Sequence, residues 1–115
     1  MYVYDRANEL AKDIRESEEY RAYKELKDKV DANTTTKGLV AEYKRLQFQA
    51  QAIMMSGQQP GSDIMEKLQK VGEVLAYDKD ASDYFAAEYK MNMMISDIYR
   101  IIGEACGIDL DMLKK

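Results

Sequence analysis

The chain has 115 residues and a mass of 13.3 kDa, which predicts a single domain spanning residues 1–115. It has no histidine and one cysteine, Cys106, which excludes Ser-His-Asp and Cys-His catalysis, histidine-ligated metals and an internal disulfide. A net charge of −4 and an isoelectric point near 4.9 argue against a general binder of the nucleic-acid phosphate backbone.

The first third of the chain predicts two helices with a break between them. Apolar residues recur in steps of four and three from Val3 to Ile14, which is the spacing of one helix face. The phase changes at residues 16–19, and apolar residues resume with Tyr20 and Tyr23. We therefore expect a kink or a new helix start there, with the Ser17 hydroxyl capping the second helix.

A longer helix is predicted from an Asn33 cap to about Ser56. Its main apolar stripe consists of Leu39, Tyr43, Leu46, Ala50 and Ile53. A second stripe, formed by Phe48, Ala52 and Met55, begins halfway along. A helix that is apolar on two sides is expected to be buried between more than one neighbour. Gly57 and Pro60 then end the helix.

The remaining residues predict a shorter helix that begins at Ser62 and a long one capped within residues 78–80. The apolar stripe of the long helix is Tyr84, Ala87, Met91, Met94, Ile98, Ile101 and Ala105. Gly107 is placed for a Schellman-type stop. No strand pattern occurs. The predicted fold is all-α, with four to five helices, two of them long, forming an elongated helical bundle that oligomerises.

Candidate chemical sites are few. No phosphate-binding glycine motif occurs. An all-carboxylate metal site is conceivable from Glu66, Glu73, Glu88 and Asp97. Because these residues lie off the apolar stripes or at their edges, solvated helix faces are the better interpretation. Cys106 lies on the apolar face of the last helix, where a cysteine is usually a small buried hydrophobe. We expect no catalytic residue, no metal and no cofactor.

Basic residues gather around the first break and along the second helix, where tyrosines are interleaved with them. They are Arg15, Arg21, Lys24, Lys27 and Lys29. Acidic residues alternate with them, so a solvated helix face is the better interpretation and direct nucleic-acid binding is not expected. Methionines cluster in the two long helices, and packing is favoured over a promiscuous binding surface.

No targeting or membrane segment is predicted. The least charged stretch, residues 46–62, contains five glutamines, two glycines and one proline, and such a segment cannot span a bilayer. A single thiol fits a reducing compartment. We therefore expect a soluble cytoplasmic protein.

Short runs of residues recur along the chain in a distinctive order and spacing. They are Leu10-Ala11 with Ile14, Glu16-Ser17-Glu18-Glu19-Tyr20 with Tyr23-Lys24, Leu46-Gln47, Gln51, Met55-Ser56-Gly57, Pro60, Leu68-Gln69, Ala87-Glu88, Ile98, Ile102 and Gly107. With these runs the chain resembles the YlbF/YmcA family of small helical bacterial proteins, and within it the YheA-like branch. The similarity extends over nearly the whole chain.

The resemblance implies an oligomer-forming cytoplasmic protein of Gram-positive-type bacteria with no enzymatic activity. Members of the family are regulatory partners in competence, sporulation and biofilm development, and accessory factors of a membrane-anchored ribonuclease. Some hold an iron–sulfur cluster through clustered cysteines, a property that does not transfer to a chain with Cys106 alone.

We therefore predict a non-enzymatic helical interaction protein with a regulatory role. The alternative is an accessory factor of RNA metabolism that is associated with a ribonuclease. The expected partners are a second copy, in a homodimer, and a regulatory protein or ribonuclease. The predicted protein interface consists of Leu39, Tyr43, Leu46, Ala50, Ile53, Met91, Met94, Ile98 and Ile101.

Overall fold

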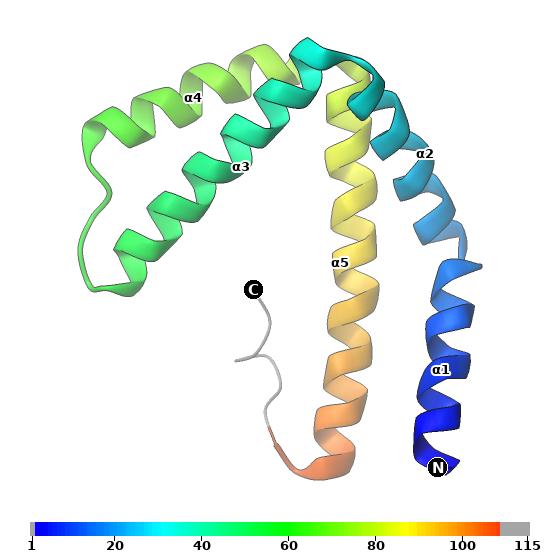
Figure 1. The fold of residues 1–115 in the computed structure, drawn as a ribbon. Helices are drawn as coiled ribbons and strands as arrows, with labels where there is room; N and C mark the ends of the chain where they lie inside the picture. The colour runs from blue at the N-terminus through cyan, green and yellow to red at the C-terminus, as the bar shows by residue number, and fades with distance from the viewer. Residues whose placement is uncertain (1, 109–115) are drawn as a thin grey trace. The chain divides into compact units, whose positions relative to one another are not determined.

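The computed structural model describes residues 2–108, which contain five helices and no strand (Figure 1). The helices are α1 (Tyr2–Arg15), α2 (Glu18–Ala32), α3 (Thr34–Met55), α4 (Ser62–Ala76) and α5 (Lys79–Cys106). The predicted all-α fold with four to five helices, two of them long, is confirmed, since α3 has 22 residues and α5 has 28.

Short polar side chains cap α2 and α3 where the sequence predicts them. The Ser17 hydroxyl accepts a hydrogen bond from the Tyr20 N–H at 3.1 Å and donates one to the Ile14 carbonyl at 2.6 Å, so it joins the end of α1 to the start of α2. The Asn33 side chain accepts from the Thr36 N–H at 3.1 Å, which confirms the predicted cap of α3.

Two glycines end helices in the left-handed conformation. Gly57 has φ of 91° and Gly107 has φ of 74°. The residue after each glycine donates its N–H back to the preceding turn: Gln58 to the Ile53 carbonyl at 3.2 Å, and Ile108 to the Gly103 carbonyl at 3.0 Å. Both stops are therefore of the Schellman type, as predicted for Gly107.

The chain divides into two compact units. One unit is Leu26–Tyr84, and the other combines Met1–Glu25 with Phe85–Lys115. The expectation of one domain over residues 1–115 stays a prediction.

The first unit is built around a hairpin in which α3 packs against α4. Its core holds Leu46, which is 1% exposed, together with the buried Val30, Val40 and Leu75. The buried Thr36 hydroxyl donates to Asp78 Oδ2 at 2.6 Å, and Asp78 Oδ1 accepts from the Ala81 N–H at 3.2 Å. One carboxylate thereby links the start of α3 to the cap of α5.

The second unit contains α1 and most of α5 and buries much less. None of the residues of α1 is buried. Along α5, Ala87 and Gly103 are buried within this unit, whereas Ile101 and Ile102 are exposed. The apolar pattern of this unit is therefore far from fully covered in the part of the chain that the structure describes.

Candidate interaction surfaces

The end of the α3–α4 hairpin carries no charge. Residues 46–62 form the second half of α3, the connecting segment and the first residue of α4, and no Asp, Glu, Lys or Arg occurs among them. In a chain of which 33% is charged, this run is exceptional. We call residues 46–62 the hairpin tip.

A groove lies between the two helices at this end. It has a volume of about 570 Å³, within the ~300–1,000 Å³ typical of ligand pockets. Met54, Met65 and Leu68 supply apolar side chains, and glutamines supply uncharged donors and acceptors. The lining residues of this hairpin groove are Gln47, Ala50, Gln51, Met54, Gln59, Pro60, Met65 and Leu68.

The outer stripe of α3 consists of Phe48, Ala52 and Met55. Phe48 is 67% exposed and Met55 is 77% exposed. Phe48 lies two residues from both Leu46 and Ala50, which is about 200° around a helix, so it points away from the buried face. The expected burial of this second stripe is therefore not found in the part of the chain that the structure describes.

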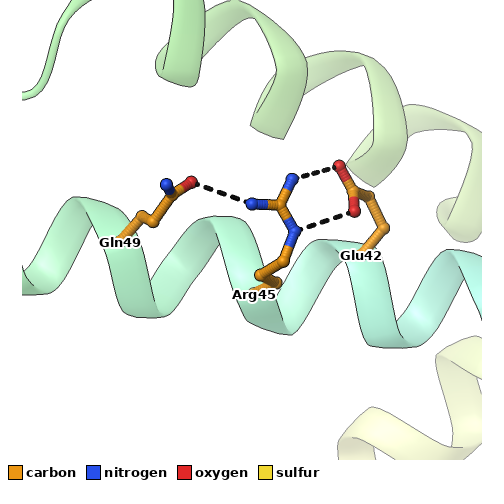
Figure 2. A network of polar contacts seen from close by, with 3 residues as sticks. All are labelled: Glu42, Arg45 and Gln49. Carbon is orange, nitrogen blue, oxygen red and sulfur yellow. Dashed lines mark hydrogen bonds and ion pairs between the residues drawn. The ribbon is translucent and has the colours of Figure 1, made fainter.

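The charge that borders the tip on α3 is paired within that helix, whereas Asp63 borders the tip on α4. The Arg45 guanidinium donates to both carboxylate oxygens of Glu42, at 2.7 and 3.1 Å, and to Gln49 Oε1 at 3.3 Å (Figure 2). The hydrogen bond from Arg45 lowers the pKa of Glu42, and the same bond raises the pKa of Arg45. Both groups therefore stay charged as a pair beside the uncharged tip.

The α3 part of the predicted interface lies in the hairpin unit. Leu46 and Ala50 are buried there, and Leu39, Tyr43 and Ile53 are half-buried. In α5, Met91, Met94 and Ile98 are half-buried, and Ile101 is 63% exposed. The two sets belong to different units, and their role in an interface stays a prediction.

Sequence reasoning did not select the groove residues that come from the connecting segment and α4. Gln59, Pro60 and Met65 lie off the helical stripes, so periodicity alone could not find them. The available signal is the charge-free run of residues 46–62, which from the sequence alone argues only against a membrane span.

A second, smaller hollow lies in the other unit and is lined by the start of α2 and by α5. It has a volume of about 380 Å³ and combines methionine side chains with charged groups of both signs. Its lining residues are Glu19, Lys90, Met93, Met94, Asp97 and Ile98.

Cys106 is exposed, so the expectation of a small buried hydrophobe is wrong. It occupies the last turn of α5, immediately before the chain reverses at Gly107, and its neighbours Ile101 and Ile102 are exposed as well. The apolar face of α5 continues to its end, but within residues 2–108 the structure leaves that end uncovered.

The carboxylates considered for a metal site do not gather. Within residues 2–108, no group of three or more Cys, Asp or Glu side chains is placed to hold a metal ion. Asp97 instead accepts a hydrogen bond from Arg100 at 3.0 Å.

The basic residues of α2 alternate with acidic partners. Lys27 Nζ lies 2.9 Å from Asp31 Oδ2, one helical turn further on. Such pairs support a helix and reduce its net positive field.

None of the described helices is long and apolar enough to cross a bilayer.

Residues 3–106 match the family model described as "Control of competence regulator ComK, YlbF/YmcA". The chain belongs to the YlbF/YmcA family. This confirms the resemblance found in the sequence.

Two curated relatives match most of the chain. A UPF0342 protein of Symbiobacterium thermophilum is 32% identical over 97% of this chain and 100% of its own length. A UPF0342 protein of Halothermothrix orenii is 35% identical over 89% of this chain and 86% of its own length. Neither name states an activity.

A solved structure shows the same fold. It is titled "Protein of Unknown Function (DUF964) from Bacillus stearothermophilus" and has a TM-score of 0.77 at 20% identity, covering 93% of this chain and 94% of the other.

Proposed function

We propose that this member of the YlbF/YmcA family is a non-enzymatic regulatory protein of the bacterial cytoplasm that acts through protein–protein contacts. The observation that carries the proposal is the exposed apolar end of α5. Ile101 is 63% exposed and Ile102 is 43% exposed, and Tyr99 is exposed beside them.

Single exposed apolar residues are normal on protein surfaces, but a contiguous row is typical of an interaction site. Ile98, Ile101 and Ile102 are three and four residues apart, so their side chains lie on one side of α5. Complete burial of an isoleucine side chain contributes about 1.5–3 kcal/mol. A partner that covers this row therefore gains binding energy without any charged contact.

The family description supports a regulatory role, because it refers to control of the competence regulator ComK. That description concerns the family. For this chain, we propose regulation by contact as the mechanism, with the end of α5 as the surface offered to the partner protein.

Quantitative co-purification tests the proposal. Tagged wild-type protein and an Ile101→Glu/Ile102→Glu variant are expressed in the bacterium that encodes the chain, and bound proteins are compared by mass spectrometry. We expect at least one protein to be enriched with the wild type and to fall about tenfold or more with the variant, because charge at a buried hot spot is strongly unfavourable. A ribonuclease among the enriched proteins would place the regulation in RNA turnover.

Val74→Glu is the matched control, since Val74 is also an exposed β-branched residue on a helix but lies on α4. It should retain the wild-type set of bound proteins. Equal recovery of every protein with the wild type and the α5 variant would contradict the proposal.

A further inference from the structure

The two walls of the hairpin groove differ in chemistry. On the α3 wall, Gln47, Gln51 and Met54 are four and three residues apart, so they form one line along that helix. On the α4 wall, Met65 and Leu68 supply apolar side chains. The groove therefore has two uncharged amides along one side and an apolar surface along the other.

The amides of Gln47 and Gln51 are available to a ligand. Both residues are exposed, and within residues 2–108 the structure shows no hydrogen bond in which either side chain takes part. Gln49 lies between them in the sequence, but it is about 200° away from each around the helix. Its side chain accepts a hydrogen bond from Arg45 at 3.3 Å (Figure 2). The helix therefore presents two amides to the groove and uses the third elsewhere.

The spacing of these two amides matches an extended polypeptide. Four residues of an α-helix rise about 6 Å, so Gln47 and Gln51 are about 6 Å apart along α3. In an extended chain, the N–H and C=O groups of alternate residues point to the same edge and repeat every ~6.6 Å. A glutamine amide has both donors and an acceptor, so each can pair with both groups of one residue. A single small amide would engage one glutamine, whereas an extended segment engages both.

Charge restricts what can enter the groove. None of the described residues that line it is charged. Asp63 borders the tip, but it lies two residues from Met65, about 200° around α4, so it points away from the groove. An ammonium or carboxylate group in the groove would lose hydration without gaining an opposite charge, which is strongly unfavourable. The occupant that fits is therefore uncharged.

We propose that the hairpin groove binds an uncharged, extended segment of a partner protein through its backbone. From Gln47 to Met54, the α3 wall is about 10 Å long, which accommodates roughly three extended residues. Gln47 and Gln51 bond to the first and third of these residues, and the apolar side chains of the segment contact the α4 wall. The groove belongs to the Leu26–Tyr84 unit and the exposed end of α5 to the other, so this site goes beyond the proposed function and does not depend on it.

Methionine methyl NMR with a defined peptide tests the inference on the unaltered protein. The probe is acetyl-Ala-Val-Ser-Val-Ala-amide, which is uncharged and longer than the groove. We expect saturable shifts of the Met54 and Met65 methyl groups, with assignments from single Met→Leu variants. The methyl groups of Met91, Met93 and Met94 on α5 are the internal control and should stay constant. No shift, or shifts confined to the α5 methionines, would overturn the inference.

Three altered probes identify which part of the peptide is bound. A peptide with every backbone nitrogen methylated keeps the side chains but has no N–H donors, and it should bind about tenfold more weakly or worse. Glutamate or lysine in place of the central serine should weaken binding similarly, because a charge then enters the groove. Equal affinity of the methylated or the charged peptides would overturn the inference. Equal shifts with N-methylacetamide, at the same concentration of amide groups, would show a site for small amides and also overturn it.

Glutamine variants provide the test on the protein side. Gln47→Leu/Gln51→Leu keeps the approximate size of both side chains but removes their amides, so the dissociation constant of the peptide should rise about tenfold or more. Gln49→Leu is the matched control on the same helix and should retain wild-type affinity. Wild-type affinity of the double variant, or an equal loss in the control, would overturn the inference. Circular dichroism verifies helix content; if the double variant does not fold, the methylated peptide on the wild type decides.

The outcomes separate this inference from the proposed function and from self-association. Shifts of the Met54 and Met65 methyl groups on dilution of the protein without peptide would mean that a second copy occupies the groove, and would overturn the inference. Failure of the peptide to bind leaves the proposed function intact, because that function is tested through Ile101 and Ile102 on α5.

Discussion

Helices α1 and α3 have the same kind of apolar spacing, but only α3 buries it. Within the α3 stripe, Leu46 and Ala50 are buried and the other members are half-buried, whereas α1 has no buried residue. The helix α3 is followed by a short connection that brings α4 back alongside it. An apolar stripe therefore predicts which face of a helix is available for packing, and the neighbouring element decides whether that face is covered.

Truncation at the centre of the hairpin should have the largest effect on stability. Leu46 is 1% exposed, so Leu46→Ala leaves a cavity and is expected to lower the free energy of unfolding by about 2–5 kcal/mol. Leu10→Ala on α1 removes the same atoms from a residue that is 36% exposed and should cost well under half as much. Urea unfolding monitored by circular dichroism measures both. Equal costs would show that α1 is covered in solution.

The next largest loss of stability is expected at Asp78, the carboxylate that links the start of α3 to the cap of α5. Asp78→Ala removes the cap of α5 and leaves the buried Thr36 hydroxyl without its acceptor, so it should cost about 1–3 kcal/mol. Asp80→Ala, at an exposed position in the first turn of the same helix, is the control and should cost under about 1 kcal/mol. Urea midpoints at neutral pH compare them, and a control that costs as much as Asp78→Ala would contradict this role.

The same group predicts a pH dependence. The hydrogen bond from the Thr36 hydroxyl, followed by that from the Ala81 N–H, lowers the pKa of Asp78 below its usual value. A lowered carboxyl pKa contributes stability above about pH 4, and that contribution is lost as the pH falls through the folded-state pKa. The stability difference between wild type and Asp78→Asn should therefore narrow between about pH 6 and pH 2. Urea midpoints at both pH values test this, and a constant difference would refute it.

Two glycines in the hairpin should show the smallest effects and report how closely it is packed. A Cβ atom at Gly38 meets nothing within 4 Å, so Gly38→Ala should stabilise α3 by about 0.5–1 kcal/mol. A Cβ atom at Gly72 would lie 3.2 Å from Cε1 of the Tyr43 ring, so Gly72→Ala should gain less or cost stability. Thermal unfolding distinguishes the two. An equal gain at both positions would mean that the Tyr43 ring moves freely.

The sequence by itself determined the helices and where they begin and end. Ser17, Asn33 and Gly107 each perform the local role that their side chain, or the absence of one, predicts. These roles depend on hydrogen bonds within a few residues, and such short-range interactions can be read directly from the chain. The core residue Leu46 was also identifiable from its spacing.

Only the tertiary structure decided which apolar faces remain uncovered. The stripe of α5 follows one repeat from Tyr84 to Ile101, but Tyr84 is buried and Ile101 is 63% exposed. The hairpin groove likewise combines residues from α3, the connecting segment and α4 that no single periodicity relates. Periodicity depends on the geometry of one helix, whereas burial depends on a second element that comes from elsewhere in the chain.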